Sequence, residues 1–199
     1  MVATSRLRPG PVPRSVSPGI GGVTPSWLEA RLHDAGVRIL DVRADAPRDE
    51  ASGPRLRSAG NVELRPFAHL GGPPGWKMSV ERYPARRGLA AAYVQGHIPG
   101  AVALDVRAVL FDEAGDVVSA PELAIAMSGL GVGDTHTIVL VDAGRPDAAV
   151  AAAWALVRYG HQDVHVLEGG FARWVGEGRA VSREIVQHPP ASFTAKVPS

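Results

Sequence analysis

The run TIVLVD at residues 137–142 is a short, strongly apolar stretch that ends in a carboxylate. Unbroken apolar residues without alternation are typical of a parallel strand that is buried on both faces. An alanine-rich stretch from Asp147 to Tyr159 follows, with Val150, Trp154 and Val157 at helical spacing. Small side chains with one larger apolar face suit close packing on a sheet. This region therefore predicts a strand that leads into a helix.

The same alternation of strand and helix extends in both directions. Apolar runs predict strands at residues 37–41, 101–104 and 164–167. Helices are predicted from residue 25 to Gly36, where Thr24 caps and Pro25 suits the first position, and at 90–95, 121–130 and 171–176. Strands separated by helices indicate an α/β fold, a central parallel sheet with helices on both faces.

Composition narrows the classes of function. The chain has 199 residues, 45% of them hydrophobic, and a net charge of +1, so it can bury a core but has no overall field for nucleic acid. No apolar run approaches the roughly 20 residues of a membrane span, and no secretory signal is recognisable, which predicts a cytoplasmic location. Cysteine is absent, which excludes disulfides, thiolate metal sites and cysteine nucleophiles.

Glycine and proline divide the chain into regions. Residues 1–23 carry arginine, proline and glycine but few large apolar residues, so we expect a flexible tail. The domain is predicted over 24–181, with a long insertion at 44–89 that is rich in glycine and proline. Residues 182–199 read as a linker-like C-terminal tail.

Three motifs, in order, resemble the rhodanese family of sulfurtransferases. They are LDVR at 40–43, GHIPGA at 96–101, and LEGGF at 167–171 followed by Trp174. The resemblance covers roughly residues 24 to 181 and implies the rhodanese-like fold. The residues of this sequence that carry it are Asp41, Arg43, Gly96, His97, Pro99, Gly100, Gly169, Gly170 and Trp174.

A finer resemblance is to the first domain of tandem thiosulfate or 3-mercaptopyruvate sulfurtransferases. Trp154 with RYGH at 158–161, the long segment before Gly96, and a linker-like tail at 190–196 favour that half. In those enzymes the first domain usually lacks the nucleophile, and the second domain carries the catalytic cysteine. The resemblance therefore implies a second, cysteine-bearing rhodanese domain as a partner.

The loop after the strand at 137–142 corresponds to the active-site loop of the family. Alignment on the helix places Asp142 where catalytic members have cysteine, and a carboxylate cannot hold a persulfide. Pro146 removes an amide donor, and two carboxylates oppose the single Arg145, so at most weak anion binding is expected. The degenerate loop comprises Asp142, Ala143, Gly144, Arg145, Pro146, Asp147 and Ala148.

Two roles for the acidic residues of this loop compete. The favoured interpretation is that Asp142 or Asp147 caps the loop and helix with its carboxylate. The alternative makes Asp142 a covalent nucleophile, but no motif for a base or a metal lies nearby.

Other polar residues have structural and functional interpretations. His97 lies in a turn, where a hydrogen-bonding role is favoured over that of a general base. Asp41 and Arg43 are expected to form an ion pair at a strand end. His161 and His165 straddle a turn and a strand, which argues against a metal site, and no cofactor is expected. The basic residues Arg82, Arg86 and Arg87 suggest a solvated loop rather than a nucleic-acid patch.

These observations predict a rhodanese-like domain that is inactive in sulfur transfer by itself and supports the other half of a tandem enzyme. The alternative is a regulatory or docking module that uses the loop at 142–148 or the insertion at 44–89. A third expectation is a truncated gene product whose other half is encoded separately or lost.

Overall fold

The computed structural model describes residues 20–43, 90–144 and 146–197. Five parallel strands form one sheet in the order β1-β5-β4-β2-β3. This confirms the predicted α/β class with a parallel central sheet. The strands are β1 (Ile20–Val23), β2 (Val37–Asp41), β3 (Val102–Ala103), β4 (Thr137–Val141) and β5 (Val164–Leu167).

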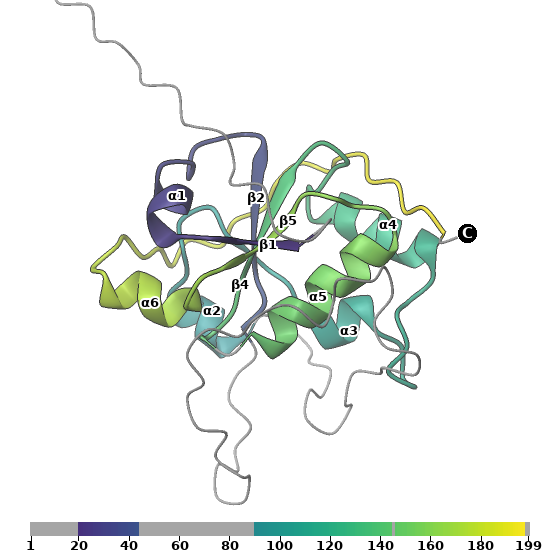
Figure 1. Ribbon diagram of the computed structural model, residues 1–199, viewed down its shortest axis with the longest axis horizontal. Coiled ribbons are helices and arrows are strands. Elements are labelled where there is room, and N and C mark those ends of the chain that lie inside the picture. Colours follow the sequence, from purple (N-terminus) through teal and green to yellow (C-terminus); the bar gives the residue numbers. More distant parts are fainter. Residues whose placement is uncertain (1–19, 44–89, 145, 198–199) are drawn as a thin grey trace, which may run out of the picture.

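Helices cover both faces of this sheet. Figure 1 shows α1 and α6 on one side and α3, α4 and α5 on the other. The two faces bury separate apolar clusters, one built around the alanines of α5 and one around Leu28 and Trp174. The helices are α1 (Pro25–Glu29), α2 (Ala91–Gln95), α3 (Val106–Leu110), α4 (Ala120–Gly129), α5 (Asp147–Arg158) and α6 (Gly170–Gly176).

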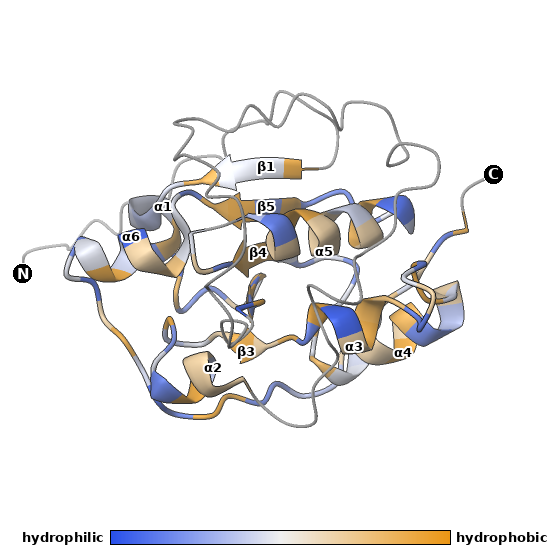
Figure 2. Ribbon diagram, turned by 90° about the horizontal axis from the view of Figure 1, so that it is seen from below, coloured by the Kyte–Doolittle hydropathy of each residue, from blue (hydrophilic) through white to orange (hydrophobic). Residues whose placement is uncertain are grey.

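Strand β4 lies between β5 and β2 and contributes side chains to both apolar clusters. Ile138 and Leu140 pack into the α5 cluster, whereas Val139 and Val141 pack into the opposite one. Successive side chains of a strand point to opposite faces, so a strand buried on both sides needs apolar residues at every position. Figure 2 shows the hydrophobic colouring of the central strands between the helices.

Three elements differ from the sequence-based predictions. Residues Ile20–Val23, placed in the tail, form edge strand β1 and pair in register with β5. The first helix ends at Glu29 rather than near Gly36, because the following amides bond to carbonyls three rather than four residues back, as in Arg31 to Leu28. The short helix α3 was not predicted, and its N-cap Asp105 accepts a hydrogen bond from the amide of Ala108.

The segment after α6 returns across the domain to α4 (Figure 1), and on the way Nε of its Arg183 donates to the carbonyl of Gln95 at the end of α2. Residues 182–197, interpreted from the sequence as a linker-like tail, contain no helix or strand but pack on the domain. Ser182 pairs with His97 through two backbone hydrogen bonds of 2.8 and 2.9 Å. Phe193 is buried and stacks on His161, with ring centroids 5.5 Å apart. Thr194 donates its amide to Asp134 at 2.7 Å.

Acidification is expected to destabilise the domain through His136 and His161, which lie under this returning segment. Burial is the main cause that lowers the pKa of each imidazole below its usual 6.5. The unfolded state therefore binds more protons, so stability falls as pH drops below about 6.5 toward the folded-state values. The pKa of Asp134 is also lowered, but this carboxyl affects stability only when the pH falls below its ordinary pKa of 3.8. That range lies below the one in which the histidines act.

Urea unfolding at pH about 7.5 and at pH about 5.5 measures this loss of unfolding free energy, because histidine is the side chain that titrates between the two pH values. The double variant His136→Gln/His161→Gln should lose most of the difference. An unchanged difference in that variant would contradict the assignment to these two histidines.

Candidate active-site loop

The LDVR and LEGGF motifs lie at one edge of the sheet, and Gly96 of the GHIPGA motif reaches that edge through its hydrogen bond with Arg43. Strands β2 and β4 are in register, with Asp41 opposite Val141, so both end at the same level. Strand β5 ends at Leu167 and leads through Gly169 into α6. The carboxyl ends of parallel strands form the usual ligand-binding edge of an open α/β sheet. The candidate site is therefore the loop that follows β4.

Asp142 lies at the base of this loop and is only 3% exposed. Its Oδ1 accepts a hydrogen bond of 2.5 Å from the backbone amide of Gly144. Its backbone carbonyl accepts from the amide of Phe171 at 2.8 Å, which ties the loop to α6. The carboxylate thus caps its own loop, as the favoured interpretation expected, whereas the N-cap of α5 has no side-chain hydrogen bond.

Gly170 allows this close approach. It has φ +56°, and a Cβ on it would meet Oδ1 of Asp142 and lie 2.6 Å from both the carbonyl oxygen of Asp142 and the amide of Gly144. Gly144 itself has φ +93°. Gly170 therefore lets the chain pass directly against the loop that holds Asp142.

Helix α5 begins directly after the loop. Its N-cap residue is Pro146, which has no amide to offer, and Asp147 is the acidic residue of its first turn. Arg145 and the whole insertion at 44–89, with Arg82, Arg86 and Arg87, lie outside the described residues. The described part of the loop thus carries two carboxylates, the buried one of Asp142 and the exposed one of Asp147.

The predicted ion pair between Asp41 and Arg43 is present and buried. Nη2 of Arg43 lies 2.6 Å from Oδ2 of Asp41, and their side chains are 7% and 0% exposed. The same Nη2 donates to the carbonyl of Gly96 at 2.6 Å. The guanidinium also stacks 3.8 Å from the ring centre of Phe171. One side chain therefore joins β2, the turn at Gly96 and helix α6.

His97 is fully buried, and both of its ring nitrogens face backbone carbonyls. Nδ1 lies 2.9 Å from the carbonyl of Tyr93, and Nε2 lies 2.9 Å from that of Glu184. The ring stacks on Tyr93 with centroids 3.9 Å apart. These contacts favour the structural role over that of a general base, which needs access to a substrate proton.

The remaining motif residues shape turns or core. Gly100 has φ +81° in the turn after Pro99, and the amide of Ala101 bonds to Ile98 at 3.0 Å. Trp174 is fully buried and donates Nε1 to Ala180 at 2.7 Å. Gly100 thus shapes a turn, and Trp174 belongs to the apolar cluster around Leu28.

The two histidines considered for a metal are engaged separately. His161 Nε2 lies against the carbonyl of His136, and His165 Nε2 lies 2.8 Å from Asp163. Within the described ranges, no group of three or more potential ligands is placed to hold a metal ion. In the same part of the chain, every helix is too short or too polar to cross a bilayer.

Sequence reasoning missed the residues that connect the motifs. The contacts of Arg43 with Gly96 and Phe171, and of His97 with Glu184, join positions far apart in the chain. The available signal was that LDVR and LEGGF each fall at the end of a predicted strand, whereas GHIPGA precedes one.

The arrangement defines the class of the protein as a rhodanese-like fold. Residues 82–177 match the sequence model of the family described as Rhodanese-like domain. The chain thus carries a rhodanese-like domain, and its homologues are thiosulfate and 3-mercaptopyruvate sulfurtransferases.

Individual relatives make the comparison more particular. The 3-mercaptopyruvate sulfurtransferase of Escherichia coli is 34% identical over 85% of this chain and 49% of its own length. A protein of Mycolicibacterium smegmatis named for thiosulfate sulfurtransferase activity is 38% identical over 54% of this chain and 39% of its own. The chain spans about half or less of these relatives.

A solved structure agrees in fold. SseA of Escherichia coli, among the 3-mercaptopyruvate sulfotransferases with the rhodanese fold, superposes with a TM-score of 0.64 at 25% identity. The match covers 89% of this chain and 55% of SseA.

Proposed function

We propose that this chain is a non-catalytic rhodanese-like domain that supports a second, cysteine-bearing rhodanese domain. The observation that carries the proposal is Asp142, a buried carboxylate at the position expected for the family's nucleophile, in a chain without cysteine. The relatives' greater length supports the second half of the proposal.

Sulfur transfer requires a sulfur nucleophile. A thiolate attacks the outer sulfur of thiosulfate, forms a persulfide and releases sulfite, and cyanide then takes the sulfur as thiocyanate and regenerates the thiolate. A carboxylate oxygen does not form such a carrier. Asp142 is moreover already bonded to the loop amide of Gly144, which holds it in a capping role.

Exposed apolar side chains beside the site edge offer a surface for the partner. Val94, Val181 and Ile185 are 47%, 45% and 54% exposed. Gly96 packs against Val181, and the Nε of Arg183 bonds to the carbonyl of Gln95 at 2.9 Å, so α2 and the returning segment lie together. We call Val94, Val181 and Ile185 the apolar patch.

Affinity capture of the tagged chain from its native cells tests the partnership. The expected result is a partner with a rhodanese-like cysteine that forms thiocyanate from thiosulfate and cyanide, and its loss with Val181→Asp/Ile185→Asp. Ile125→Asp, on α4 and 74% exposed, is the matched control. A partner without such a cysteine would instead favour a regulatory or docking module.

The variant Asp142→Cys tests the loop itself. With thiosulfate, it is expected to gain the mass of one sulfur atom by intact-protein mass spectrometry, because it supplies the missing thiolate. The wild-type chain and Asp142→Asn should gain none. Sulfur uptake or thiocyanate formation above the uncatalysed rate by clean wild-type protein would refute the inactive assignment.

A further inference from the structure

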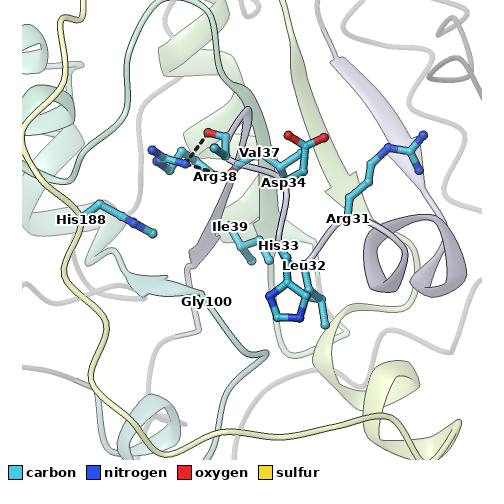
Figure 3. Close-up of a pocket in the computed structure, with 10 residues that line it drawn as sticks. Arg31, Leu32, His33, Asp34, Val37, Arg38, Ile39, Gly100 and His188 are labelled. Carbon is cyan, nitrogen blue, oxygen red and sulfur yellow. Dashed lines mark hydrogen bonds between the residues drawn. The ribbon is translucent and has the colours of Figure 1, made fainter. Parts of the chain in front are cut away.

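A pocket of about 230 Å³ opens at the sheet edge opposite the Asp142 loop. It lies where β2 begins, and its lining includes Leu32, His33, Arg38, Gly100 and His188 (Figure 3). Ordinary small-molecule pockets are about 300–1,000 Å³, so this space suits an ion or a very small molecule.

Arg38 brings a positive charge that the protein satisfies only with dipoles. Its Nε donates to the carbonyl of Gly131 at 2.8 Å, and its Nη1 donates to those of Ala35 and Val37 at 2.8 and 3.0 Å. Among the described residues, no carboxylate forms an ion pair with it. Its Nη2 makes no hydrogen bond within the described part of the chain, and Arg38 is one of the residues that line the pocket.

Partial burial makes this charge costly. Loss of solvation lowers the pKa of Arg38. A guanidinium still carries its charge at neutral pH, so an anion placed beside it would recover part of the lost solvation energy.

His188 lies close to Arg38. The backbone of Gly131, which accepts from Arg38, packs directly against the Cβ of His188. The charges of Arg38 and His188 both lower the pKa of neighbouring His136, after the larger effect of burial. Arg38, His136 and His188, which come from three separate segments, therefore lie close together at this edge.

The remaining charged residues of the pocket are directed elsewhere. The carboxylate of Asp34 accepts from the amide of Gly36 at 2.8 Å, and Figure 3 shows it beyond Val37 from the Arg38 guanidinium. Arg31 stacks on Trp27 at 4.1 Å and points away from the pocket centre. The side of the pocket that can contact a ligand is thus the one formed by Arg38 and His188.

We propose that this pocket binds a small tetrahedral oxyanion of the phosphate or sulfate class. Nη2 of Arg38 and the imidazole of His188 donate to its oxygens, and His33 lies at the rim. Charge-assisted hydrogen bonds of this kind are the strong ones for such ligands. The site is independent of the Asp142 loop and of the proposed partner domain.

Titration of the full ¹⁵N-labelled chain with sodium phosphate, followed by two-dimensional NMR, tests the site. Sodium chloride at equal ionic strength and pH is the reference. The expected result is saturable shifts confined to amides near residues 32–39, 100 and 188. His188→Gln should weaken binding about threefold or more, and Arg38→Gln about tenfold or more, as expected for lost charge-assisted bonds.

Arg158→Gln is the control, because this exposed arginine of α5 lies outside the pocket. It should leave phosphate binding unchanged. Since Arg38→Gln removes backbone contacts and can disturb the fold, His188→Gln is the deciding variant, because His188 is half-buried and lies outside any helix or strand. Shifts that chloride reproduces, or affinity that His188→Gln leaves unchanged, would overturn the proposal.

Discussion

Replacing Arg43 with alanine is expected to lower the free energy of unfolding by about 3–5 kcal/mol, the usual cost of leaving a buried charge without its partner. Asp41, with its side chain 0% exposed, would lose its ion pair. The carbonyl of Gly96 and the ring of Phe171 would lose their contacts at the same time. Urea unfolding of the wild type and the variant measures the difference.

Two further variants separate the charge from the packing. Arg43→Lys keeps a charge but not the planar fork that reaches Asp41 and Gly96 together, so an intermediate loss is expected. Asp41→Asn/Arg43→Ala removes both charges and should be less unstable than the sum of its single variants. A loss below about 1 kcal/mol for Arg43→Ala would place the pair among ordinary surface ion pairs and contradict its role.

Gly170→Ala is expected to destabilise the domain by about 2–6 kcal/mol, from backbone strain and overpacking of about 1–3 kcal/mol each. The new methyl group would press on the carboxylate and carbonyl of Asp142 and on the amide of Gly144. The same unfolding measurement applies, and displacement of the loop is read from the NMR shift of Gly144.

Two nearby glycines serve as matched controls. Gly178 has φ +71° but nothing within 4 Å of its Cβ position, so Gly178→Ala reports backbone strain without a clash. Gly176, in α6, has no positive φ and no atom within 4 Å of its Cβ position. Gly176→Ala should therefore leave stability unchanged or raise it by about 0.5–1 kcal/mol. Equal losses for Gly170→Ala and Gly178→Ala would show that contact with Asp142 carries no cost.

The central part of the fold was predictable because its signal is local and strong. An unbroken apolar run marked β4, and small residues marked α5. Strand β1 gave no such signal, since two of its four residues, Gly21 and Gly22, are poor strand formers. Helix α3 has five residues, too few for a helical period to be visible.

The candidate site was predictable in its chemistry but only partly in its geometry. The lack of cysteine and the position of Asp142 follow from the sequence and the family resemblance. The stacking of Arg43 on Phe171 depends on how α6 packs, which no local pattern encodes. The use of Glu184 by His97 likewise depends on the path of the returning segment.

Strand β1 has a consequence for any shortened form of this protein. It pairs with β5 along residues 20–23, on the outside of the sheet. A chain started at Thr24 would leave unpaired those backbone amides and carbonyls of β5 that face β1, and an open strand edge is a template for association with other chains. Expression boundaries placed before Ile20 keep that edge closed, whereas boundaries taken from the motifs alone would favour aggregation.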